Sequence, residues 1–246
     1  MIDYASVRRR LHALAAHRRD NGFDTSAIAA EVDTLPDSLD AAIGFVARLN
    51  ALTYRDAILT HRGTGVYATM WTAAAIAHAL TAPEDPLDIL RVANRYIPQR
   101  SRFHEAMETG LRLVEGAPDW RSAYDAIHSR LGDGVSGSHC CVYEESATLI
   151  NTLKHARRVD EGICLQVMQG NDTDSYAATA GSLLGAYLGA GTLDEARWVA
   201  PFRDTLRTAL AWFYEPSLSA IARRMGGLPR RLVSGETTGT TISEWK

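Results

Sequence analysis

Residues 169–191 read QGNDTDSYAATAGSLLGAYLGAG, in which two carboxylates spaced i, i+2 precede a stretch of mostly small side chains. This stretch is predicted to form a helix over residues 175–188. Each glycine in a helix interior costs roughly 1 kcal/mol relative to alanine. Glycines such as Gly181 and Gly185 therefore indicate a packing requirement, because a missing side chain lets neighbouring backbones approach closely. We expect a buried, central helix with the two acids at a pocket beside its start.

The four residues Asp-Thr-Asp-Ser at 172–175 have two interpretations. Mg²⁺ prefers hard oxygen ligands, commonly one or two carboxylates, with water and substrate oxygens at the remaining positions. Asp172, Asp174 and Ser175 supply three such oxygens at the helix start. Short Asp/Ser segments also cap helices, and the positive end of a helix favours carboxylates with or without a metal. The spacing alone leaves a helix cap and a metal site both open.

The rest of the chain repeats helical signals, whereas alternating β-branched segments between turns are scarce. The pattern predicts an all-α fold. An alanine-rich stretch at residues 66–80 is predicted to be a second closely packed central helix. The remaining helices are predicted at residues 6–18, 39–49, 86–96, 102–114, 119–131, 144–155, 160–168, 201–214 and 216–225.

Composition restricts the class of protein. The 246 residues fit one large domain, and 46% hydrophobic with 22% charged residues is ordinary for a soluble protein. No apolar run approaches the roughly 18 residues of a membrane span, and the basic N-terminus lacks the apolar stretch of a secretory signal. We therefore expect a cytoplasmic protein with no membrane partner. A net charge of −3 argues against a nucleic-acid partner, and three cysteines predict neither a disulfide framework nor a zinc site.

Three stretches, in this order along the chain, resemble one protein family. Residues 55–80 contain a Thr-His pair and a Gly-Tyr loop, residues 96–107 and 119–127 follow, and residues 170–175 lead into the Ala/Gly-rich helix. Together they resemble the ADP-ribosylglycohydrolase family, of the dinitrogenase reductase-activating glycohydrolase type. The resemblance extends over about residues 40–225.

The resemblance implies an orthogonal multi-helix bundle that hydrolyses an ADP-ribosyl or related N- or O-ribosyl bond with a metal-activated water. It implies Mg²⁺ or Mn²⁺ as the cofactor, held by Asp172, Asp174 and Ser175, with both aspartates catalytic. The expected substrate is small-molecule or protein-linked ADP-ribose. The residues implied to contact it are His61, Gly63, Gly65, Tyr67 and His139.

Several of these residues also have structural interpretations. His61 alone is compatible with a hydrogen-bonded structural histidine, and Tyr67 on a helix is compatible with a core position. The backbone N–H groups of residues 63–66 lead into a helix, an arrangement that suits a phosphate. Glu145 stands where a small amide or serine is usual in the family, so it departs from the family's pattern.

The family's N-terminal Thr-Asp-Asp-Thr motif, which builds the other half of the metal centre in relatives, does not occur in this sequence. We therefore expect a truncated domain and divide the chain into a helical segment at 1–35, an ADP-ribosylglycohydrolase-like domain at 36–228 and a mobile tail at 229–246. Three hypotheses stay open. The chain is a metal-dependent hydrolase, or a non-catalytic protein that binds ADP-ribose or a partner, or it obtains the missing acids from a partner chain.

Overall fold

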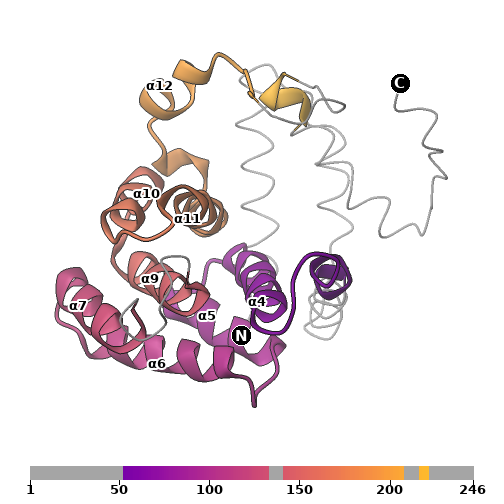
Figure 1. Ribbon diagram of the computed structural model, residues 1–246. Coiled ribbons are helices and arrows are strands. Elements are labelled where there is room, and N and C mark those ends of the chain that lie inside the picture. Colours follow the sequence, from indigo (N-terminus) through magenta and orange to yellow (C-terminus); the bar gives the residue numbers. More distant parts are fainter. Residues whose placement is uncertain (1–51, 133–140, 208–215, 222–246) are drawn as a thin grey trace. The chain divides into compact units, whose positions relative to one another are not determined.

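A computed structural model describes residues 52–132, 141–207 and 216–221, which fall into two compact units (Figure 1). The first unit covers the described residues up to 193, and no β-strand occurs among them. Its helices are α4 (Thr64–Ala79), α5 (Leu87–Ala93), α6 (Arg102–Gly116), α7 (Trp120–Leu131), α9 (Val142–His155), α10 (Val159–Met168) and α11 (Thr173–Leu188), with the 3-10 helices η1 (Asn94–Tyr96) and η2 (Ala190–Thr192). The predicted all-α fold is confirmed.

Local sequence signals set where these helices begin. Ser101 Oγ accepts a hydrogen bond from the backbone N–H of His104 at 3.1 Å, and Asp119 Oδ1 accepts one from Ser122 at 2.8 Å. These caps satisfy backbone donors that have no partner inside the first turn of α6 and α7. The predicted helices at 6–18 and 39–49 and the predicted tail at 229–246 lie outside the described residues.

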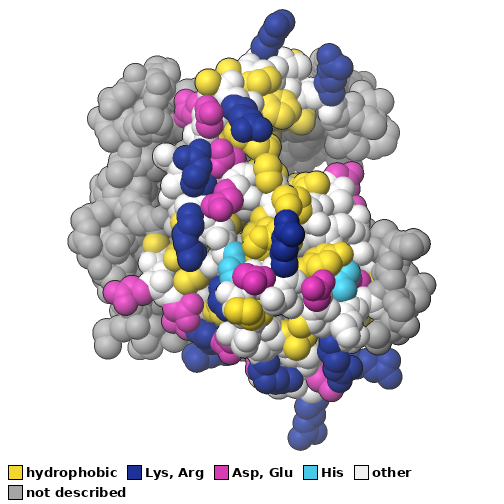
Figure 2. Space-filling model, turned by 90° about the vertical axis from the view of Figure 1, so that its left-hand side faces the viewer, with side chains coloured by type: hydrophobic (Ala, Val, Ile, Leu, Met, Phe, Trp, Pro, Cys, Tyr) yellow, Lys and Arg dark blue, Asp and Glu magenta, His cyan; other side chains and the backbone are white. Residues whose placement is uncertain are grey.

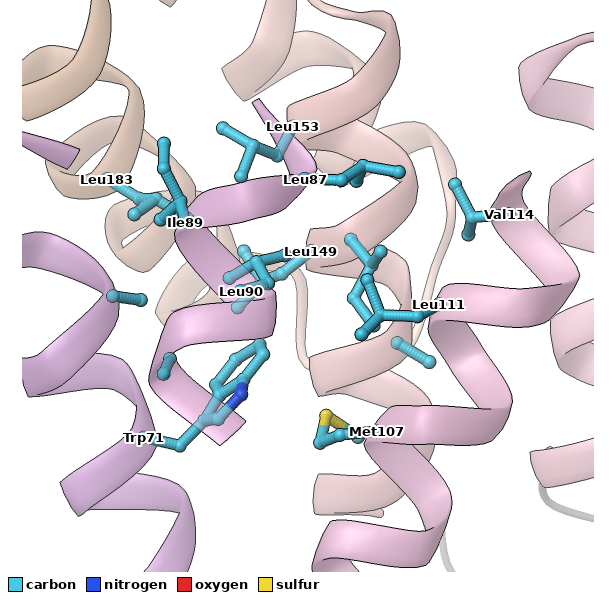
Figure 3. Close-up of a cluster of buried hydrophobic side chains, with 14 of the residues drawn as sticks. Trp71, Leu87, Ile89, Leu90, Met107, Leu111, Val114, Leu149, Leu153 and Leu183 are labelled. Carbon is cyan, nitrogen blue, oxygen red and sulfur yellow. The ribbon is translucent and has the colours of Figure 1, made fainter. Parts of the chain in front are cut away.

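The core of the first unit lies where α4, α5, α6 and α9 meet (Figure 3). Trp71 packs edge-on against Phe103 with ring centroids 5.9 Å apart, and Leu90, Met107 and Leu149 close the space around them. Full burial of one such side chain stabilises a fold by about 1.5–3 kcal/mol. Apolar residues that recur three and four positions apart in the sequence thus lie on one face of each helix, and that face is buried in the core.

The buried side-chain amide of Asn94 provides a hydrogen-bond acceptor for the indole N–H of Trp71 in this core. Trp71 Nε1 donates to Asn94 Oδ1 at 2.7 Å, and Asn94 Nδ2 donates to Glu108 Oε1 at 2.6 Å. Asn94 is only 2% exposed, so these bonds replace the water that burial removes from both polar groups.

α10 and α11 lie side by side (Figure 1) and approach closely at a glycine of α10. A Cβ atom on Gly162 would lie 2.0 Å from Leu184 Cδ1, whereas one on Gly185 would meet no atom of the described residues within 4 Å. The expected packing role is therefore wrong for Gly185. The expectation of a buried α11 is also wrong, because only Ala180, Leu183 and Leu184 of this helix are buried.

The second unit contains α12 (Glu195–Trp198), η3 (Ala200–Phe202) and a short helical segment at residues 218–221. The helix predicted at 201–214 is wrong over residues 203–207, where Arg203 and Asp204 have positive φ angles of 49° and 54°. The carboxylate of Asp204 instead accepts hydrogen bonds from Ser217 and Ser219. Such side-chain bonds compete with helix formation and stabilise a turn.

The surface of the described residues carries both signs of charge, and Figure 2 shows acidic and basic side chains interspersed with apolar ones on one face. Arg91 forms ion pairs with Asp85 at 2.7 Å, with Asp88 at 2.6 Å and with Glu115. Among the helices of this part of the chain, none combines the length and the apolar character that crossing a bilayer requires.

Candidate functional site

The first turns of α9 join the two segments that the sequence predicts to form one site. Tyr143 Oη and Thr64 Oγ1 share a hydrogen bond of 3.1 Å, which connects α9 to the start of α4. Glu145 Oε1 accepts a hydrogen bond of 3.1 Å from the backbone N–H of Asp172, which connects α9 to the start of α11. One helix therefore contacts both the Gly-rich loop and the acidic segment.

The acidic segment is a tight turn that leads into α11. Gly170 and Asn171 have positive φ angles of 83° and 60°, so the chain reverses direction between α10 and α11. Asp172 then occupies the N-cap position, but its carboxylate makes no regular capping hydrogen bond. That carboxylate lies instead beside the Ser175 hydroxyl. A backbone contact from Ser175 to this carboxylate also contributes, so a helix cap and a cation site both stay open for this side chain.

Electrostatics keeps the Asp172 carboxylate ionised. A hydrogen bond from the Ser175 side chain lowers the pKa of Asp172 below its ordinary value. Asp174 and Ser175 are exposed, and Asp172 is half-buried. Solvent therefore reaches all three side chains, and the place of these acids at a pocket stays a prediction.

The donor set at the start of α11 fits a hard divalent cation. Two carboxylates and one hydroxyl offer the oxygen ligands that Mg²⁺ accepts, with room for several waters. Within residues 52–132, 141–207 and 216–221, no three His, Cys, Asp or Glu side chains gather as a metal-binding group. Asp172, Asp174 and Ser175 offer two carboxylates and one hydroxyl at the start of α11, and their role as metal ligands stays a prediction.

The Gly-rich loop places His61 at the start of α4. His61 is exposed, and its Nδ1 lies 2.8 Å from the Thr60 hydroxyl, so the interpretation as a hydrogen-bonded structural histidine and that as a ligand contact both stay open. A Cβ atom on Gly65 would lie 2.8 Å from His61 Cδ2, which means that the glycine makes room for this ring. Gly63 has a positive φ of 48°, a conformation that glycine adopts without strain.

Tyr67 and His139 complete the set of residues expected to contact substrate. Tyr67 is half-buried and packs against the hydrophobic core, which agrees with its structural interpretation. His139 lies outside the described residues. The structure therefore brings the acidic segment and the loop to one helix and leaves the place of His139 a prediction.

A buried polar network next to the acidic turn was missed in the sequence. Asn151 Nδ2 donates to Gln169 Oε1 at 2.7 Å, and Gln169 Nε2 donates to Thr152 Oγ1 at 2.8 Å. Thr152 Oγ1 also donates to Gln166 Oε1, and Gln166 Nε2 donates to Thr148 Oγ1, each at 2.8 Å. The signal for it was present, because polar residues recur in α9 at helical spacing where apolar ones are expected.

Tyr176, in the first turn of α11, connects the acidic turn to α9. Its Oη lies 3.3 Å from Ser146 Oγ of α9. Burial raises the pKa of Tyr176 well above its ordinary value, and the nearby charges of Glu145 and Asp172 raise it further. The phenol is therefore protonated at neutral pH.

Two neighbouring glutamates of α9 point to different helices. Glu145 contacts the acidic turn, whereas Glu144 Oε1 lies 2.8 Å from His128 Nε2 of α7. Both are almost fully buried, with exposed fractions of 5% and 1%. The pair gives a matched comparison, because one residue contacts the candidate site and the other does not.

A cavity of about 510 Å³ lies away from the start of α11 in the first unit. It is lined by residues at the start of α5 and at the ends of α6 and α9. Its cations already have partners, because Arg91 pairs with three carboxylates and Lys154 Nζ donates to carbonyl oxygens at the end of α6. This arrangement stabilises helix ends, since a cation interacts favourably with the carbonyls of a helix C-terminus.

Comparison with known proteins gives one match. The model of a family described as ADP-ribosylglycohydrolase matches residues 5–229, which is most of the chain. The match begins ahead of residues 40–225, over which the motifs resemble that family. No curated protein and no solved structure matches the chain.

Proposed function

Because this chain belongs to the ADP-ribosylglycohydrolase family, we propose that it hydrolyses an ADP-ribosyl or related N- or O-ribosyl bond with the aid of Mg²⁺ or Mn²⁺. Family membership makes this chain a protein of the glycohydrolase type. The kind of bond that it cleaves and the cation that it uses are what we propose. The observation that carries it is the contact of α9 with both the start of α4 and the start of α11. We also propose a cytoplasmic location.

The start of α11 is the proposed cation site. Asp172, Asp174 and Ser175 would hold the ion through two carboxylates and one hydroxyl at the start of one helix. A divalent cation supplies a Lewis acid for sugar oxygens and lowers the pKa of a bound water. The open faces of Asp174 and Ser175 leave room for substrate at the same place.

The start of α4 is the proposed site for the phosphates of ADP-ribose. Its first turn contains no acidic side chain, and the amide end of a helix favours an anion. The exposed imidazole of His61 lies against that turn at Gly65, within the same loop. Gly63, Tyr67 and His139 are retained as proposed contacts of the ligand.

The test of this proposal is turnover. The full chain is incubated with Mg²⁺ or Mn²⁺ and with ADP-ribosylated arginine, ADP-ribosylated serine or nucleoside donors, and released ADP-ribose is measured. We expect cation-dependent release that Asp172→Ala abolishes. Asp125→Ala is the matched control, because Asp125 is an exposed aspartate of α7. Turnover no greater than that of Asp172→Ala would exclude the hydrolase.

The absent Thr-Asp-Asp motif favours a second candidate function, a protein that binds ADP-ribose or a partner without turnover. Calorimetric titration with ADP-ribose separates the two functions, since binding without turnover supports the second. A partner chain that supplies the missing acids is the third arrangement. A mass measurement in solution, with candidate partners present, detects such a complex.

A further inference from the structure

The turn before α11 has an unusual backbone that requires support from outside. Gly170 and Asn171 are both in the left-handed region, so residues 170–172 continue neither α10 nor α11. Asparagine adopts this conformation more readily than most residues, but two consecutive left-handed residues interrupt the helical hydrogen bonds. The position of Asp172 therefore depends on contacts that other elements make with this turn.

The first support holds the residue that precedes the turn. Gln169 is fully buried, and its Nε2 donates to the backbone oxygen of Thr148 at 3.2 Å and to Thr152 Oγ1 at 2.8 Å. Its Oε1 accepts from Asn151 at 2.7 Å. All of these partners belong to α9, so the end of α10 is fixed to one face of that helix.

The second support holds the first residue after the turn. The carboxyl group of Glu145 is nearly buried, and its Oε1 accepts the backbone N–H of Asp172 at 3.1 Å. Thr148 Oγ1 donates to the backbone oxygen of Glu145 at 2.7 Å. Residues 145, 148 and 152 lie on one helix face because they are three and seven positions apart. This polar strip of α9 therefore holds both ends of the turn.

We propose that Glu145 is a positioning residue: by accepting a hydrogen bond from the backbone N–H of Asp172, it fixes the place of the Asp172 carboxylate. The cation part of this inference rests on the proposed function, whereas the ordering of the turn does not. A ligand set that is held in place before binding loses less conformational freedom when a cation arrives. The role requires an acceptor oxygen at this place and does not require the negative charge of Glu145.

Hydrogen exchange in the full chain tests the ordering of the turn. Glu145→Gln keeps an acceptor oxygen, and Glu145→Met keeps the length of the side chain without one. Loss of this one hydrogen bond is expected to change exchange by about a factor of ten, which corresponds to about 1.4 kcal/mol. We expect exchange at residues 169–175 to be roughly tenfold faster in Glu145→Met and close to wild type in Glu145→Gln.

Glu144→Met is the matched control, because Glu144 is an equally buried neighbour that contacts α7. It is expected to leave exchange at residues 169–175 unchanged. Equal exchange in wild type and Glu145→Met, or equally fast exchange in all three variants, would overturn the proposal. Should Glu145→Met not fold, Glu145→Ala, which also lacks an acceptor oxygen, takes its place: faster exchange at residues 169–175 is expected, and wild-type exchange would overturn the proposal.

Mn²⁺ affinity, measured by calorimetry on the same variants, separates positioning from direct ligation. We expect at least a tenfold loss for Glu145→Met and recovery of most of that loss in Glu145→Gln. An equal loss in both variants would show that Glu145 acts through its charge or as a ligand, and would overturn the proposal. If wild-type protein binds no Mn²⁺, the proposed function fails, and the exchange rates alone decide the positioning role.

Discussion

Replacing Gly162 by alanine tests the packing of α10 on α11, which sets the distance between the two helices that flank the acidic turn. The added Cβ atom would lie 2.0 Å from Leu184 Cδ1 and 3.0 Å from Ala156 Cβ. Carbon atoms pack at about 3.5–4.0 Å, so the Leu184 methyl group must move by roughly 1.5 Å. Leu184 is 1% exposed and belongs to the buried hydrophobic cluster of the first unit.

Two opposing effects determine the size of the loss. Alanine stabilises a helix interior by about 0.5–1 kcal/mol relative to glycine. Overpacking of a buried contact costs about 1–3 kcal/mol, and the short distance places this site in the upper part of that range. Gly162→Ala is therefore expected to lower the free energy of unfolding by about 1–2 kcal/mol. Gly185→Ala, which meets no atom of the described residues within 4 Å, is expected to raise it by about 0.5–1 kcal/mol.

Urea unfolding of the full chain, followed by circular dichroism and tryptophan fluorescence, measures both variants against wild type. The two substitutions add the same group to neighbouring helices, so their difference isolates the close contact from helix propensity. A Gly162→Ala variant as stable as Gly185→Ala would refute the packing of α10 on α11. A Gly185→Ala variant that loses stability would show that α11 is covered at this position.

Three further substitutions test other parts of the structure. Asn94→Leu leaves Trp71 Nε1 without its acceptor and is expected to cost roughly 1–3 kcal/mol in urea unfolding, so a loss below about 0.5 kcal/mol contradicts the buried bond. Ser175→Ala is expected to raise the pKa of Asp172 toward its ordinary value, and an unchanged carboxyl titration by NMR contradicts that hydrogen bond. Burial lowers the pKa of His78 below 6.5, so the folded state favours the neutral ring. The contribution of His78 to the free energy of unfolding is therefore complete above pH 6.5 and falls as the pH drops, because the unfolded chain then binds the proton first. His78→Gln is expected to reduce this loss of unfolding free energy on acidification, and an unchanged pH dependence counts against it.

Much of the helical pattern follows from sequence. The helices from α4 to α11 begin and end close to the predicted limits, because caps such as Ser101 and Asp119 and apolar spacing act locally. The order of motifs also predicts that the acidic segment and the Gly-rich loop belong to one site; the structure shows that both contact α9, and the shared site stays a prediction. The family match over residues 5–229 confirms the family that this order indicated.

The parts that could not be predicted depend on contacts between distant residues. The turn at residues 203–207 replaces a helix because Asp204 bonds to Ser217 and Ser219, thirteen and fifteen residues away. The close approach of α10 and α11 depends on Gly162 opposite Leu184, and composition alone pointed to the glycines of α11. Helical spacing shows that two residues share a face, and it does not show which neighbour that face meets.

The proposed cation site is tested most directly by crystals of the full chain grown with Mn²⁺ and measured for anomalous scattering. The account predicts one strong peak at the start of α11, in contact with the carboxylates of Asp172 and Asp174. The peak is expected to disappear in Asp172→Ala and to persist in Asp125→Ala. No peak at this position with saturating Mn²⁺, or a peak that Asp172→Ala leaves unchanged, would contradict the account.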